Sequence, residues 1–211
     1  MLLNRFISGP PLDVGLVSKL NLPQIKGRAS FFSKSYFGQE CEKLIGSRYI
    51  KDSGVKATVY EFIKTHYHEG GCGLFGRGDP VVIDRLKKLL LDLKIDLKEE
   101  QIHEVIETAV QRSRNWAHLS QLYEACIPEI EVFEPAGCCD FCKAIHGKVI
   151  TVKTAYNKML SLIEMSPDAF EREIAVNVPI VENIGIFIDQ GLLPPYHFRC
   201  KGAIIKKVRN D

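Results

Sequence analysis

Two short pairs of Cys and His residues, far apart in the sequence, constrain the fold of this chain more than any other feature. The stretch CCDFC contains Cys139 and Cys142, and the stretch LPPYHFRC contains His197 and Cys200, each pair separated by two residues. This spacing lets both side chains of a pair reach one ion, as in structural zinc sites. If all four residues bind, a Cys3His shell is complete and has no open position. The spacing therefore predicts a structural zinc ion rather than a catalytic one.

A zinc ion at this site would connect two distant parts of the chain. It would join the first pair to the C-terminal stretch and hold the residues between them as an insert. Pro194 and Pro195 favour an extended backbone on the approach to His197. Two alternatives stay open. Cys138 could replace Cys139, because adjacent residues in a strand point to opposite faces, or the thiols could be buried apolar side chains that never meet the imidazole.

The composition indicates the redox state of the thiols and the cellular compartment of the protein. The seven Cys residues are an odd number, and the N-terminus lacks a basic leader followed by a long apolar block. We therefore expect reduced thiols in a cytoplasmic protein rather than a disulfide framework. No apolar run reaches the roughly 18 residues that a membrane span needs, so a soluble protein without a membrane partner is expected. Lys and Arg number 28 against 26 Asp and Glu, which gives no overall charge for nucleic-acid binding.

Apolar periodicity and turn residues predict an α+β protein whose N-terminal half is mostly helical. Residues 1–33 contain Gly, Pro and short apolar runs and are expected to form an irregular arm. A breaker with N-cap character, Asp52-Ser53-Gly54, separates the next two helices. Asp79 then caps a helix that begins at Pro80. In order, the expected helices cover residues 36–49, 55–69, 80–94 and 98–123.

The C-terminal half is predicted to add a small amount of β-structure. Two alternating stretches should pair as a hairpin with the Cys cluster at its tip, followed by two helices and a zinc-clipped extended segment. Ser166 is expected to cap the second of these helices, and residues 181–191 fit either a helix or a strand. The expected strands and helices are 129–135, 147–152, 153–165 and 166–173. These patterns divide the chain into an N-terminal region, 1–78, and an α+β domain, 79–211.

A second cluster of metal-binding residue types precedes the expected helix at 80–94. His66, His68 and Cys72, with Glu69 beside them, could form an open three-ligand site of catalytic type. On a helix, however, His66 and His68 would lie on different faces, and the following Gly-Gly ends the regular structure. A cluster without a metal is therefore the preferred interpretation.

Three other features have a functional interpretation that competes with a structural one. The stretch GCGLFG matches a dinucleotide fingerprint, but the strand that must precede such a loop is not expected. His146 could act near the ion, or it could be a residue of the hairpin turn. Arg112 and Arg114, with Trp116, could contact phosphate and base. Trp116 fits better as an anchor of the core.

The stretch CCDFCKAIHGKVI followed by LLPPYHFRCKGAII resembles the C-terminal signature of the phage Mu F-like head-morphogenesis proteins, the minor head proteins of tailed phages. In that family, C-x-x-C and a small apolar turn ending in Gly-Lys are followed by Pro-Pro-x-His-x-x-Cys and a basic residue. The matching positions are Cys139, Cys142, Gly147, Lys148, Pro194, Pro195, His197, Cys200 and Lys201. Lys201 departs from the Arg that is usual there. The resemblance covers about residues 100–208.

This resemblance implies a non-enzymatic minor capsid protein of a phage, a prophage or a domesticated relative. Its implied role is head morphogenesis and virion assembly, by binding portal or capsid proteins, with DNA as a further candidate partner during packaging. It implies no small-molecule substrate and a location in the host cytoplasm or in the virion. The alternative is a metal-dependent nuclease or toxin effector, in which His146 or the cluster at 66–72 accompanies an open metal site.

Overall fold

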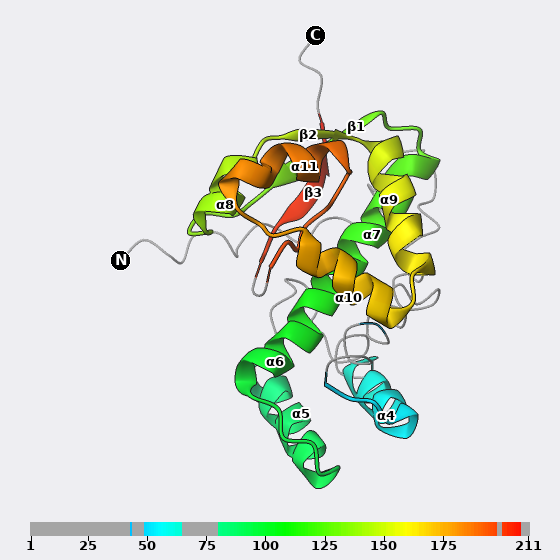
Figure 1. The fold of residues 1–211 in the computed structure, drawn as a ribbon, viewed down its shortest axis with the longest axis vertical. Coiled ribbons are helices and arrows are strands. Elements are labelled where there is room, and N and C mark those ends of the chain that lie inside the picture. The colour runs from blue at the N-terminus through cyan, green and yellow to red at the C-terminus, as the bar shows by residue number, and fades with distance from the viewer. Residues whose placement is uncertain (1–42, 44–48, 65–79, 198–199, 208–211) are drawn as a thin grey trace, which may run out of the picture.

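The computed structural model describes residues 43, 49–64, 80–197 and 200–207, and it confirms the predicted α+β class. A long helical rod runs from a group of helices at one end of the molecule towards a small sheet at the other (Figure 1). The sheet and the helices of the C-terminal half pack against the upper part of the rod. Among the described residues, no helix combines the length and the apolar character needed to cross a membrane.

Two helices and the start of the rod form the first apolar cluster, here called the helical cluster. Helix α4 spans Ser53–Lys64 and helix α5 spans Pro80–Asp92. The Asp52 carboxylate accepts a hydrogen bond from the Val55 amide at 2.9 Å, so the N-cap character predicted for the stretch 52–54 is confirmed, with Asp52 as the cap. The buried members of the helical cluster are Ile50, Val59, Ile83, Leu86, Leu90, Leu97, Ile102, Ile106, Ala109 and Val110.

The rod follows the predicted helix at 98–123 closely, but it is not α-helical throughout. It consists of α6 (Glu99–His103), the π-helical segment η3 (Glu104–Thr108) and α7 (Ala109–Glu124). Helix α7 belongs to both halves of the protein, since it begins in the helical cluster and its later residues lie in the second core. Between the two apolar stretches, its buried side chains are polar: Arg112, Ser113 and Asn115.

The predicted hairpin is confirmed, and a third strand completes the sheet. Strands β1 (Glu129–Phe133) and β2 (Val149–Thr151) pair antiparallel, with Ile130 opposite Ile150. Strand β3 (Ala203–Lys206) lies on the other side of β1, also antiparallel, and was not predicted. Instead of an open tip, the hairpin carries the short helix α8, Asp140–Ile145.

Three helices between β2 and β3 complete the second core, here called the C-terminal core. They are α9 (Val152–Glu164), α10 (Pro167–Val176) and α11 (Ile184–Asp189). The first two confirm predictions, and Ser166 accepts from the Ala169 amide at 3.3 Å as the expected cap. The ambiguous stretch at 181–191 is helical, because a 3-10 turn at Val181–Asn183 leads directly into α11.

Several predictions lie outside the described residues. These are the irregular arm at 1–33, the helix at 36–49 apart from its Lys43 and Tyr49, the end of the next helix beyond residue 64, the Cys and Gly stretch at 66–78, and the N-cap at Asp79. The helical cluster contains residues from both sides of the expected boundary between 1–78 and 79–211. That boundary stays a prediction.

Candidate metal centre

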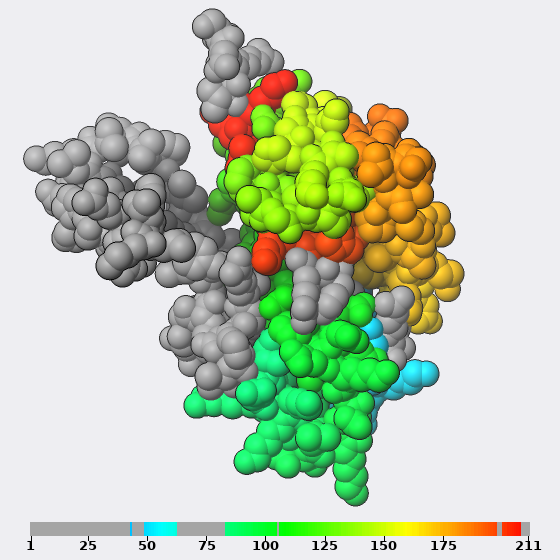
Figure 2. Space-filling view, turned by 90° about the vertical axis from the view of Figure 1, so that its left-hand side faces the viewer, coloured from blue at the N-terminus to red at the C-terminus, as the bar shows by residue number. Residues whose placement is uncertain are grey.

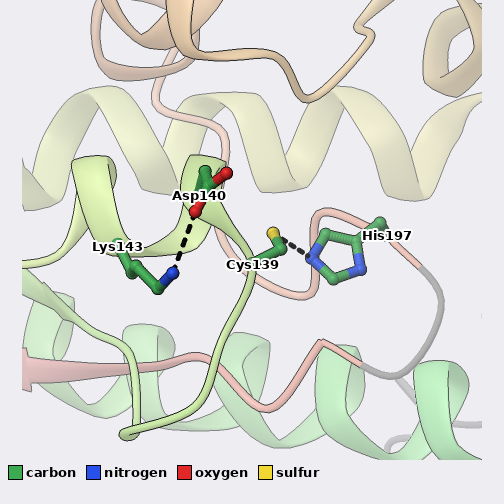
Figure 3. Close-up of polar contacts among 4 residues, drawn as sticks. All are labelled: Cys139, Asp140, Lys143 and His197. Carbon is green, nitrogen blue, oxygen red and sulfur yellow. Dashed lines mark hydrogen bonds and ion pairs between the residues drawn. The ribbon is translucent and has the colours of Figure 1, made fainter.

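The first ligand pair is positioned by the start of α8. Cys139 is the N-cap residue, with an extended backbone, and Cys142 lies in the first turn and is 1% exposed. Because an N-cap side chain lies beside the residue three positions later, the helix start directs both sulfurs to the same side. The exposed ion pair between Lys143 and Asp140, at 2.9 Å, lies apart from the Cys139 sulfur (Figure 3).

The second pair lies on the return segment, defined as residues 194–197 and 200–202, which leads the chain back into β3. Figure 2 shows the orange-red residues near the C-terminus lying between the lime residues of the hairpin and the green residues of the rod. The Cys200 amide donates to the His197 carbonyl at 3.1 Å, so these two residues lie close together. Both side chains can therefore reach the hairpin.

Apolar contacts next to the ligands bring the two pairs together. Phe141, which lies within the first pair, contacts the Tyr196 ring edge to face at 5.3 Å between centroids. Phe187 from α11 contacts the same two rings at 4.9 and 5.3 Å. Edge-to-face aromatic pairs contribute about 0.5–1.5 kcal/mol beyond the area that they bury. This trio supports the site from the side of the C-terminal core.

The ligand atoms meet across the chain as the spacing predicts. His197 Nε2 lies 3.3 Å from Cys139 Sγ and 3.2 Å from Cys142 Sγ, although 58 and 55 positions separate the residues (Figure 3 shows the first contact). Cys200 Sγ lies 3.9 Å from Cys142 Sγ. In a tetrahedral zinc site, neighbouring ligand atoms are about 3.8 Å apart for two sulfurs and about 3.5 Å apart for sulfur and nitrogen. The observed distances are close to these values, and the cluster could hold a metal ion.

Two overlapping triads make up this cluster, with Cys142 in both. Within each triad, the ligand atoms all lie within 4.8 Å of one another. One triad is Cys139, Cys142 and His197, and the other is Cys142, Cys200 and Glu134. The second triad is completely buried, whereas Cys139 in the first is exposed. The cluster therefore extends from the surface into the core.

Glu134 is a member of the site that the sequence did not predict. It is only 5% exposed, and the Cys200 thiol donates to its Oε1 at 3.7 Å. Burial, and then the charge of Cys200, raise the Glu134 pKa to about 8. The strand period was a usable signal for this residue, because Ile130 and Val132 point into the core and Glu134 continues their alternation.

The two buried thiols have opposite protonation tendencies. A hydrogen bond from Cys142 lowers the Cys200 pKa to about 6, while the same contact, together with burial, raises the pKa of Cys142 far above its usual value. Without an ion, Cys200 is therefore the first of the two to become a thiolate. A bound metal favours deprotonation of both, since a coordinating sulfur must be a thiolate.

The remaining candidate residues pack in the core or bond to the backbone of the chain. Cys138 is half-buried, packs against the C-terminal core and belongs to neither triad. His146 Nδ1 accepts from the Glu134 amide at 3.0 Å, as expected of a residue in the hairpin turn. Trp116 is 2% exposed in the C-terminal core. Arg112 is buried, and its Nη2 donates to the Pro195 carbonyl at 3.3 Å, so this guanidinium faces the chain's own backbone.

Comparison with known proteins gives no match to a family model, to a curated protein or to a solved structure. The resemblance to the Mu F-like family therefore depends on its motif residues alone.

Proposed function

We propose that this chain is a non-enzymatic minor head protein of the Mu F-like type, whose C-terminal core is fastened by one structural zinc ion. It acts by binding portal or capsid proteins, with DNA as a further candidate partner. The observation that carries the proposal is the meeting of Cys139, Cys142 and His197 across more than 50 positions of sequence, with Cys200 beside Cys142.

The chemistry of the donors favours zinc over other common ions. Three thiols and one imidazole are borderline-soft ligands of the kind found in structural zinc sites. Calcium and magnesium prefer oxygen ligands, of which Glu134 is the one member of the two triads. With all four Cys and His ligands bound, the shell has no place for water or substrate. This supports a structural role and the absence of a reaction.

The expected work of the ion is to close a long loop. It would join the start of α8 to the return segment, and helices α9, α10 and α11 lie between these two ligand pairs in the sequence. Closing a loop of this length costs conformational entropy that a metal bond can offset. The assembled surface of these helices is then available to a capsid or portal partner.

Metal analysis of the purified chain tests the zinc proposal. We expect about one zinc per chain by mass spectrometry, and loss of that zinc on changing any of the four ligands to Ser. Cys126→Ser is the matched control, because Cys126 is an exposed cysteine outside both triads. A chain that is stably folded and free of metal would contradict the proposal. Portal or terminase genes next to the coding gene would support the assembly role.

One observation favours the alternative of a nuclease or toxin effector. If Cys200 stays paired with Glu134, the triad of Cys139, Cys142 and His197 leaves a coordination position open. A buried carboxyl with a raised pKa beside an open metal site is typical of a general acid or base. The alternative predicts nuclease activity that Glu134→Gln abolishes while the variant stays folded and metal-loaded. Absence of activity in the zinc-loaded wild type would contradict it.

A further inference from the structure

We propose that Asn115 on α7, assisted by Gln111, is a positioning residue for the metal centre. Its side-chain amide bonds to both ends of the return segment, and so holds His197 and Cys200 where the ion can bind them. This inference rests on the proposed zinc site and adds to it the residues that hold the site in place.

The hydrogen bonds of Asn115 reach both ends of the return segment. Its Nδ2 donates to the Pro194 carbonyl at 2.6 Å and to the Gly202 carbonyl at 3.1 Å. Gln111, one helical turn earlier on the same face of α7, donates to the Gly202 carbonyl at 2.8 Å. His197 lies between the two anchored carbonyls in sequence, as does Cys200. Two amide side chains therefore fix where the second ligand pair starts and ends.

Because these hydrogen bonds are buried, their loss would cost more free energy than the loss of exposed ones. Asn115 is 4% exposed, and its contacts are buried. A buried carbonyl that loses its donor keeps the full cost of its desolvation, whereas an exposed one regains a bond to water. Truncation of Asn115 would remove this donor from the Pro194 carbonyl and leave the Gly202 carbonyl with Gln111 as its side-chain donor. The return segment would then gain freedom to leave the position that the ion requires.

On the side of the return segment opposite to α7, the Glu134 side chain limits how far Gly202 can move. A Cβ built on Gly202 would lie 2.1 Å from the Glu134 carboxylate and 2.7 Å from Pro194 Cβ. Gly202 therefore fits between α7 and the end of β1 only because it has no side chain. Since β1 leads into the hairpin that carries the first ligand pair, this contact also fixes the distance between the two pairs.

The position of Asn115 in the fold makes it a rigid support. It lies on α7 between residues of the helical cluster, such as Val110, and residues of the C-terminal core, such as Trp116. Side chains that orient metal ligands typically change metal affinity about 10–100-fold when they are mutated. We expect an effect of this size, because Asn115 acts on the backbone that carries two ligands.

The test is the zinc affinity of Asn115→Ala, measured by competition with a chromophoric chelator. The expected result is a zinc Kd about 10–100-fold weaker than that of the wild type. Thermal unfolding in excess zinc is measured in parallel, and Met159→Ala, a cavity variant in the same core, is measured beside it. A positioning role predicts a weaker Kd for Asn115→Ala than the loss of unfolding temperature accounts for, judged against Met159→Ala. A merely structural role predicts that the two variants follow one relation between unfolding temperature and Kd, because zinc binding is coupled to folding.

Two further variants keep the test decisive. Asn115→Leu has nearly the same size but lacks the donor and adds no charge, and it replaces Asn115→Ala if that variant fails to fold. Asn177→Ala is the matched control, because its amide also donates to a backbone carbonyl, that of Glu173 at 2.8 Å, but on α10. It should leave the zinc Kd unchanged. A folded Asn115 variant with wild-type affinity would overturn this inference alone, whereas a wild-type chain that binds no zinc would overturn the proposed function and this inference together.

Discussion

The two apolar cores of this protein are built in different ways. The buried members of the helical cluster are all aliphatic and come from Ile50, α4, α5, the loop after α5 and the rod. The C-terminal core contains the aromatic trio of Phe141, Phe187 and Tyr196, and two of its buried members are the thiols of Cys142 and Cys200. Both triads of metal-ligand residues found among the described residues belong to the C-terminal half.

This difference follows from how far apart in sequence the contacting residues lie. Much of the helical cluster joins neighbouring helices, such as α5 and α6. In the C-terminal core, β1 must pair with β3 across the whole insert of helices, and the ligand pairs meet over 55–58 positions. Loop closure over such distances costs entropy before any contact offsets it. The proposed zinc ion would offset part of this cost in the C-terminal core.

Removal of the metal should have the largest effect and should separate the two cores. We expect Cys142→Ser, or a chelator, to remove the protection of β1 and β3 in hydrogen–deuterium exchange while α5 keeps its protection. Structural zinc contributes about 10–16 kcal/mol in zinc-finger peptides, more than the net stability of most domains. Cys126→Ser should leave exchange unchanged in both cores. Equal loss of protection in α5 and β1 would show that the cores form one unit.

A cavity in the helical cluster should destabilise that cluster and leave the metal centre unchanged. Leu86 is fully buried there, so Leu86→Ala should cost about 2–5 kcal/mol of unfolding free energy in denaturant titrations. Its distance from the ligand pairs predicts an unchanged zinc Kd. A weaker Kd would mean that the rod transmits packing changes to the metal centre, and the contrast between the two cores would then be wrong.

The sequence predicted the metal pairs and most helices for reasons that are visible in the fold. Helix α5 has a strong apolar period and α10 a Ser-Pro start, and both signals are local. Cys139 and His197 were found because ligand spacing is local within each pair. Strand β3 was missed, since its identity depends on pairing with a distant β1, and α8 was missed because six residues are too few for a periodic signal.

The residues around the metal centre were harder to predict than its ligands. Asn115 and Glu134 are polar residues whose burial depends on the return segment, which reaches them only in the folded chain. Arg112 has a charge that suggests phosphate, yet it donates to Pro195. A polar side chain in a helix has no sequence signal for the backbone carbonyl that it will meet. Only the three-dimensional contacts identify the polar residues that surround the metal centre.

A glycine in the C-terminal core offers a test of smaller size. Gly191 has φ +69°, and a Cβ there would lie 2.7 Å from the Ala155 amide nitrogen. Gly191→Ala should cost about 1–3 kcal/mol through overpacking and left-handed strain, measured as a lower unfolding midpoint. Gly185→Ala is the control, because nothing lies within 4 Å of its Cβ. A destabilised control would mean that the close approach to α9 is not the cause.

The ion pair between Lys143 and Asp140 should have the smallest effect, although it lies next to Cys139. The contact with Lys143 lowers the Asp140 pKa, so any stability it adds is present above the ordinary Asp pKa and is lost as the pH falls through the lowered one. Both side chains are exposed, and solvent and salt screen such pairs. Asp140→Asn should therefore change neither the unfolding temperature nor the zinc Kd at neutral pH. A weaker Kd in this variant would show that surface charge, and not only the buried contacts of the C-terminal core, determines metal binding.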